Sequence, residues 1–262
     1  MKILVTGVTG PLGRTLVHHS ASGPHTMCGL SRRAPGSFPD SVCDWRPADL
    51  ATGEGLKAAV DGVDVVIHAA SDPQRADLVD VEGTTRLIAA ARDARIRHVI
   101  YVSVVGVDRI PYAYYLRKYA AEQITQASGV PFTILRATQF HSFIDLLLTT
   151  VARAPLLLPL PARLRVQSVA IGEVAARLLR AVDDGPSGRV LDFGGPEVLA
   201  LADAARTWAR VTGRRKVIFP LPVPGKTSRA FRTGANTAPD GERGVVTWRE
   251  WLTHRAAQQR SR

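Results

Sequence analysis

Residues 6–13 read TGVTGPLG, and their three glycines, Gly7, Gly10 and Gly13, recur at every third position. An apolar strand-like run precedes this stretch, and a helical pattern follows it from Pro11. Glycines at such a junction permit a tight turn and let backbone N–H groups approach a pyrophosphate at the positive end of the helix. The stretch therefore predicts a dinucleotide-binding turn, and glycines that serve only the turn are the alternative.

Outward from this turn, apolar runs alternate with helical patterns. The predicted strands lie near 2–7, 25–31, 41–50, 63–70, 98–106 and 131–138. The predicted helices between them lie near 11–21, 53–62, 78–94 and 113–122. This alternation predicts an α/β fold, a doubly wound parallel sheet of the Rossmann type covered on both faces.

The pattern loosens after residue 138, and a small C-terminal substrate-binding region is expected there. Its predicted elements are helices near 139–153, 171–182 and 199–213, a strand at 188–195, a long loop at 219–244 and a helix that Thr247 and Glu250 begin with a capping box. We expect one NAD(P)-binding domain over 1–262, in which 1–137 mainly binds the dinucleotide and 138–262 mainly binds the substrate.

Composition narrows the function classes. The 262 residues carry a formal net charge of +11, but the arginines are scattered and no nucleic-acid-binding motif accompanies them, so no nucleic-acid partner is expected. Two isolated cysteines form no disulfide framework, and no cluster has metal-ligand spacing. The beginning lacks a signal-peptide pattern, and the apolar stretch 143–161 is interrupted by charges and prolines. We expect a cytoplasmic protein without a membrane partner or a metal, and the oligomeric state stays open.

The end of the second predicted strand indicates which cofactor is bound. Ser31 is followed directly by Arg32 and Arg33, and no acidic residue occurs before Asp40. A carboxylate at this place favours NAD, whereas arginine favours the 2′-phosphate of NADP. The sequence thus predicts NADP(H), and two surface arginines are the alternative.

Together these motifs resemble the short-chain dehydrogenase/reductase superfamily, in particular its atypical, NmrA-like NAD(P)H-binding branch. The resemblance is carried by the glycine turn, Asp49–Leu50, the HAAS stretch 68–71, VEGTTRLIAAA (81–91), VIYVSVVGVD (99–108), Tyr114-x-x-x-Lys118 and PFTILRATQF (131–140). It implies cofactor contacts by Gly7, Thr9, Gly10, Leu12, Gly13, Ser31, Arg32, Arg33, Asp49, Leu50, Ala69, Ala70 and Lys118.

The resemblance also implies a catalytic trio of Ser103, Tyr114 and Lys118. Lys118 would hold the nicotinamide ribose and, as a nearby cation, favour the phenolate of Tyr114. Tyr114 would donate a proton to a substrate oxygen that Ser103 also binds. Tyr112 and Tyr115 compete for the role of Tyr114, which could instead be a packing residue.

We therefore expect an NADPH-dependent oxidoreductase that reduces a carbonyl, enone or quinone of an apolar or aromatic small molecule. Two alternatives stay open: a non-catalytic NADP(H)-binding redox sensor with a protein partner, and a non-redox lyase or isomerase on the same fold.

Overall fold

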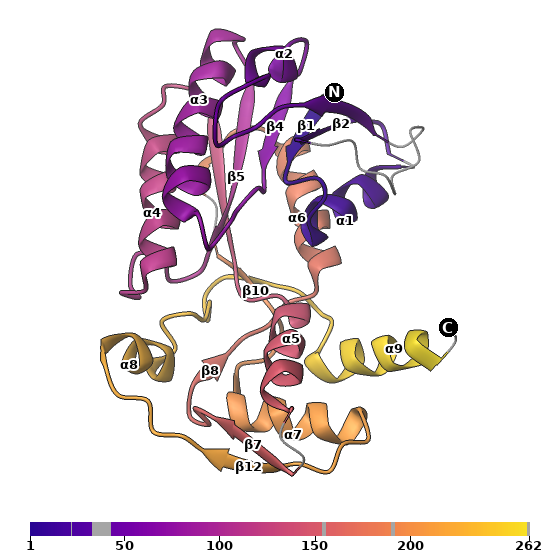
Figure 1. The fold of residues 1–262 in the computed structure, drawn as a ribbon. Coiled ribbons are helices and arrows are strands. Elements are labelled where there is room, and N and C mark those ends of the chain that lie inside the picture. Colours follow the sequence, from indigo (N-terminus) through magenta and orange to yellow (C-terminus); the bar gives the residue numbers. More distant parts are fainter. Residues whose placement is uncertain (22, 33–42, 154–155, 190–191, 261–262) are drawn as a thin grey trace. The chain divides into compact units, whose positions relative to one another are not determined.

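The computed structural model describes residues 1–21, 23–32, 43–153, 156–189 and 192–260, and the chain divides into two compact units (Figure 1). Unit 1 comprises Met1–Ser103, Ala113–Arg136 and Ile171–Leu191. Unit 2 comprises Val104–Tyr112, Ala137–Ala170 and Asp192–Arg262. The division of cofactor and substrate binding between 1–137 and 138–262 stays a prediction.

The main strands of unit 1 form one sheet. They are β1 (Lys2–Thr6), β2 (Thr26–Ser31), β3 (Asp44–Pro47), β4 (Val65–His68), β5 (His98–Val104) and β6 (Phe132–Ala137). Their order is β6-β5-β4-β1-β2-β3, and β1 is parallel to both β2 and β4. Chain order reverses between β1 and β4, as in doubly wound folds, so the predicted Rossmann-type sheet is confirmed.

Helices cover both faces of this sheet (Figure 1). One side carries α1 (Pro11–Ser20) and α6 (Ile171–Asp184), which pack against each other. The other side carries α2 (Leu56–Val60), the π-helix η1 (Asp77–Glu82), α3 (Gly83–Asp93) and α4 (Ala113–Gln126). Within unit 1, the short strand β9 (Gly188–Arg189) pairs with β6.

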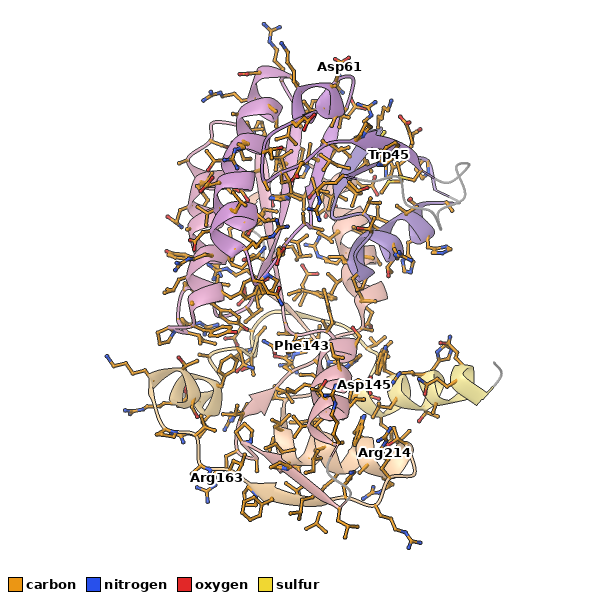
Figure 2. All side chains as sticks on the ribbon, in the orientation of Figure 1. Trp45, Asp61, Phe143, Asp145, Arg163 and Arg214 are labelled. Atoms are coloured by element: carbon orange, nitrogen blue, oxygen red, sulfur yellow. The ribbon has the colours of Figure 1, made fainter. Side chains whose placement is uncertain are left out.

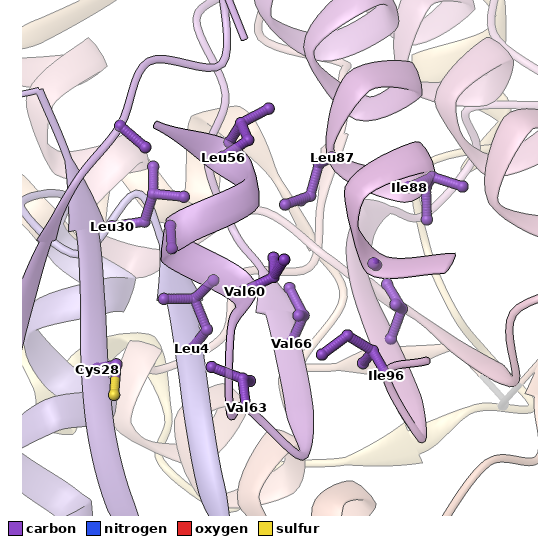
Figure 3. Packing of buried hydrophobic residues seen from close by; sticks show 14 of the residues in the cluster. Leu4, Cys28, Leu30, Leu56, Val60, Val63, Val66, Leu87, Ile88 and Ile96 are labelled. Carbon is purple, nitrogen blue, oxygen red and sulfur yellow. The ribbon is translucent and has the colours of Figure 1, made fainter. Parts of the chain in front are cut away.

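Apolar side chains of the strands and helices form the core of unit 1. Leu4, Cys28 and Val66 of the sheet meet Leu56 of α2 and Leu87 of α3 (Figure 3). Strand residues are buried because helices cover both faces, which explains why the strands read as continuous apolar runs. This core holds the carboxyl ends of β1, β4 and β5 at one edge of the sheet, where ligands bind in doubly wound folds.

Unit 2 has its own core around Trp208 and Trp248, which are both buried. Its helices are α5 (His141–Val151), α7 (Leu201–Val211), α8 (Lys226–Thr233) and α9 (Trp248–Arg260). Its short strands are β7 (Leu157–Leu160), β8 (Arg165–Val166), β10 (Phe193–Gly194), β11 (Leu199–Ala200), β12 (Val217–Pro220) and β13 (Glu242–Arg243). Across the described residues of both units, no helix is both long and apolar enough to cross a bilayer.

Three sequence expectations need correction. The predicted loop 219–244 contains the helix α8, and the predicted helix 78–94 begins as a π-helix before it continues as α3. The single strand predicted at 188–195 is two short strands, β9 and β10. The capping box is confirmed: the hydroxyl and the amide of Thr247 both donate to Glu250 Oε2, at 2.7 and 2.9 Å.

Candidate cofactor and catalytic site

The glycine turn connects β1 to the N-terminus of α1 and needs two of its glycines for its own shape. Gly7 has a φ of +68°, and a Cβ there would lie 2.8 Å from the Cα of Ala70. A Cβ on Gly13 would lie 2.4 Å from the carbonyl oxygen of Gly7. At Gly10 the same added atom would meet that oxygen at 3.2 Å, so Gly10 has more room than its neighbours. Gly7 and Gly13 therefore make the turn, and Gly10 is the glycine whose open side a ligand can use.

Gly10 is also the N-cap of α1, where no side chain caps the helix. The first N–H groups of a helix have no partner within the helix, and together they favour an anion. The free N–H groups at the start of α1, beside the open side of Gly10, therefore fit the pyrophosphate of a dinucleotide. A side chain at Gly10 would begin to fill this space. Of the other predicted loop contacts, Thr9 is exposed and its carbonyl accepts a hydrogen bond from Arg14, whereas the side chain of Leu12 is buried.

The end of β2 carries the residues predicted to read the cofactor's ribose. Ser31 is half-buried, and both its hydroxyl and its carbonyl lie within hydrogen-bond distance of the Trp45 indole nitrogen, at 3.2 and 3.3 Å (Figure 2). Arg32 follows with an exposed side chain, and Arg33 lies outside the described residues. Trp45 was not predicted as a site residue. Its contacts hold the strand end from which Arg32 projects.

Asp49 and Leu50, the predicted adenine contacts, form a tight turn after β3. Asp49 Oδ1 accepts the amide of Ala51 at 2.8 Å, and the carbonyl of Asp49 accepts the amide of Gly53 at 2.8 Å. The side chain of Leu50 belongs to the hydrophobic core. Any contact of Leu50 with a cofactor therefore comes from its backbone.

Ala69 and Ala70 follow β4 and are half-buried beside the glycine turn. The amide of Ala70 donates to Thr6 Oγ1 at 3.1 Å, which ties the ends of β4 and β1 together. His68 lies fully buried before them, within hydrogen-bond distance of Thr6 and Thr84. Burial, reinforced by the Lys118 ammonium, lowers the pKa of His68 to about 3. His68 is therefore neutral and serves as a structural link between β1 and α3.

Lys118 of α4 is almost completely buried. Its ammonium donates to the carbonyl of Val102 at 2.9 Å, lies 3.6 Å from Asp80 Oδ1 and sits 4.3 Å from the centre of the Tyr101 ring. Burial lowers the pKa of Lys118, while the carboxylates of Asp80 and Glu122 oppose that shift. The Lys118 ammonium thus lies between β5 and η1, where the Val102 carbonyl, the Asp80 carboxylate and the Tyr101 ring surround it.

Asp80, on η1, was not among the predicted site residues. It is buried, and its two oxygens accept Ser71 Oγ at 2.7 Å and the amide of Asp72 at 3.1 Å. The sequence does contain a signal for its burial, because Asp80, Thr84, Leu87 and Ala91 follow the spacing of one helix face. A carboxylate on an otherwise apolar or small face requires a partner, which here is Lys118.

Tyr114 reaches the same carboxylate through Ser71. Its hydroxyl lies 2.9 Å from Ser71 Oγ, which in turn donates to Asp80. Since a serine has only one hydroxyl hydrogen, Tyr114 is the donor in the contact with Ser71. Tyr114 and Lys118 therefore lie on one helix and meet a common anion, Asp80, the first through Ser71 and the second directly.

The third predicted member of the trio is placed differently. Ser103 is buried, and its hydroxyl has no hydrogen-bond partner among the described residues. The hydroxyl that contacts Tyr114 is that of Ser71, after β4, rather than that of Ser103, near the end of β5. Of the competing tyrosines, Tyr115 is buried in packing, and Tyr112 is 49% exposed.

Comparison with known proteins shows the family of the chain. The NAD(P)H-binding family model matches residues 7–152, more than half of the chain. An uncharacterized protein of Mycobacterium tuberculosis is 29% identical over 226 residues, which are 85% of this chain but only 24% of that protein. The chain therefore spans about a quarter of the length of this relative.

Solved structures share the fold at low sequence identity. The NADPH-dependent quinone oxidoreductase QOR2 of Escherichia coli, solved with NADPH, superposes with a TM-score of 0.80 at 17% identity, over 96% of this chain and 99% of that one. A short-chain dehydrogenase/reductase superfamily protein of Agrobacterium tumefaciens, solved with NAD, gives 0.76 at 21% identity, over 100% and 98%. The fold thus accommodates either dinucleotide.

Proposed function

Since this chain belongs to the NAD(P)H-binding family, we propose that it is an NADPH-dependent reductase of a carbonyl, enone or quinone on an apolar or aromatic small molecule. The observation that carries the proposal is the hydrogen-bonded chain from Tyr114 through Ser71 to Asp80, with Lys118 on the same carboxylate. It offers a proton donor at the edge of the sheet where a dinucleotide binds in this fold.

The proposed cofactor contacts follow from the geometry. The α1 N-terminus at Gly10 would receive the pyrophosphate, and the exposed Arg32 would bind a 2′-phosphate. No carboxylate occupies the position after Ser31, which supports NADPH over NADH. When bound, the cofactor supplies the hydride.

Tyr114 would supply the proton. Its hydroxyl, held by Ser71 at rest, would donate to the substrate oxygen as that oxygen gains negative charge, and the reduced product would carry both hydrogens. Tyr114 would then regain its proton from the Ser71 hydroxyl, which would in turn take up a proton from solvent. Solvent can supply this proton because Ser71 is exposed and Tyr114 is only half-buried. Lys118 would stabilise the transient negative charge on Tyr114.

The preference for an apolar or aromatic substrate rests on the region proposed to bind it. In unit 2, α5 carries Phe143 (Figure 2) and Leu146. These two side chains are 53% and 62% exposed. Large apolar side chains exposed on a helix favour apolar ligands over sugars. Other apolar residues of this region, such as Leu158 and Leu160, are core and do not support the inference.

The proposal is tested by incubating the full chain with NADPH or NADH and a panel of quinones, enones and aromatic ketones, while the loss of absorbance of the reduced nicotinamide is followed. Reduced product in stoichiometric amount with oxidised NADPH supports the proposal. Substrate conversion without net cofactor oxidation would identify a lyase or isomerase. Tight NADPH binding without any turnover, together with a protein complex that responds to the NADPH/NADP⁺ ratio, would identify a sensor.

A further inference from the structure

Unit 2 contains a two-stranded parallel sheet, β7 and β12, with one apolar face left uncovered. The register pairs Val217 with Leu157 and Phe219 with Pro159. Because side chains alternate between the two faces of a strand, these four residues share one face. Leu157, Val217 and Phe219 are 50%, 64% and 52% exposed. We call this face, Leu157, Pro159, Val217 and Phe219, the outer β7–β12 face.

The opposite face of the same sheet is core. Leu158 and Leu160 are buried, and Ile218 packs against the cluster that contains Trp208. A sheet with one face on the core ordinarily presents polar side chains on the other face. Here both faces are apolar, so the outer face is not explained by the folding of unit 2. Contiguous exposed apolar surface of this kind marks an interaction site.

The chain segments around the outer face carry cations and no carboxylates. No Asp or Glu occurs at 146–172 or at 204–239. Arg163 follows β7 (Figure 2), and Arg215 precedes β12; both side chains are exposed. The loop after β12 continues the apolar surface with Leu221 and Val223, which are 40% and 41% exposed.

This loop leads into α8, which adds three cations. Lys226, Arg229 and Arg232 lie at i, i+3 and i+6, so they share one side of the helix. All three are exposed, and none has an ion-pair partner within the described part of the chain. They line an open hollow together with Val223 and Pro224. The hollow therefore joins apolar and cationic surface, and anionic groups are its natural ligands.

The charge pattern distinguishes between partners. A second copy of the chain would bring the same cations against each other, since a two-fold interface pairs a surface with itself. A nucleic acid would require stacking surfaces, and the outer face offers a single aromatic ring, Phe219. An anionic bilayer satisfies both features, because apolar side chains enter the acyl boundary while cations meet lipid phosphates.

We propose that the outer β7–β12 face, with the cations of α8, docks this chain on an anionic phospholipid surface. The sequence did not lead us to expect a membrane partner, because an interrupted apolar run cannot span a bilayer. Lying on a bilayer requires no such run, only an exposed apolar face within a cationic surround. The proposal is independent of the reductase activity.

Co-sedimentation of the full chain with vesicles provides the test. Vesicles of phosphatidylcholine alone are compared with equal mixtures of phosphatidylcholine and phosphatidylglycerol, at low and at high salt. The proposal predicts binding to the mixed vesicles, little binding to the neutral ones and weaker binding as salt rises. Absence of binding to the mixed vesicles at low salt overturns it.

Variants then distinguish vesicle binding through this surface from binding through the net positive charge of the chain. Val217→Thr with Phe219→Thr keeps β-forming residues on an exposed face, so folding is preserved, and binding should fall about tenfold or more. The control is Val245→Thr, at a valine that is 80% exposed outside this surface, and it should bind as the parent does. Lys226→Gln, Arg229→Gln and Arg232→Gln should each weaken binding about fivefold.

Two results contradict the proposal even if vesicles bind. One is parent-like binding by the Val217→Thr/Phe219→Thr variant, which would leave only unspecific attraction by net charge. The other is self-association of the parent that this variant abolishes in sedimentation equilibrium, which would make the face an interface between copies.

Discussion

Lys118 Nζ lies 3.6 Å from Asp80 Oδ1, and the two side chains are 4% and 0% exposed. This ion pair joins α4 to the π-helix η1, and Ser71 extends it to Tyr114. A second ion pair joins the same two elements at the surface: Arg117 Nε lies 2.7 Å from Asp77 Oδ1, with side chains 38% and 74% exposed. The two pairs form a natural comparison between buried and exposed charge.

Asp80→Asn and Lys118→Met should each lower the free energy of unfolding by about 3–5 kcal/mol, because either change leaves an uncompensated buried charge or breaks its hydrogen bonds. The double variant should lose less than the sum of the single losses. Urea unfolding of the four proteins measures this coupling. The control, Asp77→Asn with Arg117→Met on the same elements, should change the free energy of unfolding little, because solvent screens an exposed ion pair. Equal losses for Asp77→Asn and Asp80→Asn would show that the Asp80 carboxylate is not buried against Lys118.

Gly10→Val should abolish NADPH binding while the chain still folds. The new side chain would occupy the open side of the glycine turn, where backbone N–H groups face the pyrophosphate. Calorimetric titration measures binding, and circular dichroism checks the fold. Gly172→Val adds the same side chain elsewhere in unit 1, 3.4 Å from His19, and should leave NADPH affinity unchanged. Parent-like affinity of a folded Gly10→Val protein would remove the turn from the cofactor site.

Arg32→Ala should weaken NADPH binding by about 1.5–3 kcal/mol, the range for a hydrogen bond to a charged group, and should barely change NADH binding. Arg92→Ala, which removes an exposed arginine from α3, serves as the control and should affect neither cofactor. Fluorescence titration with both cofactors measures the difference. If the parent binds NADH as tightly as NADPH, Arg32 does not read a 2′-phosphate.

Stability should fall as the pH drops below about 6.5, the usual pKa of histidine in an unfolded chain. Burial lowers the pKa of His68 to about 3 and those of His98 and His141 to about 4, so the native protein keeps these rings neutral. Because the unfolded chain takes up protons first, each ring removes up to about 1.4 kcal/mol of stability per pH unit on the way down to these values. Above about 6.5 their full contribution is present.

Urea unfolding across this range measures the pH effect. His98→Gln should flatten the pH dependence by about the slope of one histidine. A free energy of unfolding that is constant from neutral to mildly acidic pH would show that these rings are not held neutral.

Local sequence patterns predicted most helices and strands, whereas the side-chain contacts of the candidate site depend on how those elements pack. The glycine turn and the apolar strands can be predicted from the sequence, because each depends on the residue types within one short stretch. Ser103 was predicted to bind the same substrate oxygen as Tyr114, and that role stays a prediction. The contact between Tyr114 and Ser71 was not predicted, because 43 residues separate them in sequence and only the packed sheet brings the two hydroxyls together. The helical spacing that Asp80 shares with Thr84 and Leu87 indicates a buried position, but its partner Lys118 becomes evident only in the packed structure. The eight-residue helix α8 was not predicted, because the Pro- and Gly-rich stretch before it indicated a loop over the whole of 219–244.

The role of Tyr114 decides between a reductase and a protein that only binds the cofactor. Tyr114→Phe keeps the ring and removes the hydroxyl that lies 2.9 Å from Ser71 Oγ. The control is Tyr119→Phe, at a 36% exposed tyrosine of the same helix.

The decisive measurement is the rate of NADPH oxidation by the parent, Tyr114→Phe and Tyr119→Phe with the best quinone or aromatic ketone of the panel. We predict that Tyr114→Phe lowers turnover by about 10²–10⁴, the usual contribution of a positioned general acid, while NADPH affinity stays close to that of the parent. Tyr119→Phe should turn over as the parent does. Parent-like turnover by Tyr114→Phe would contradict the proposed mechanism and leave Tyr114 as a packing residue beside the cofactor.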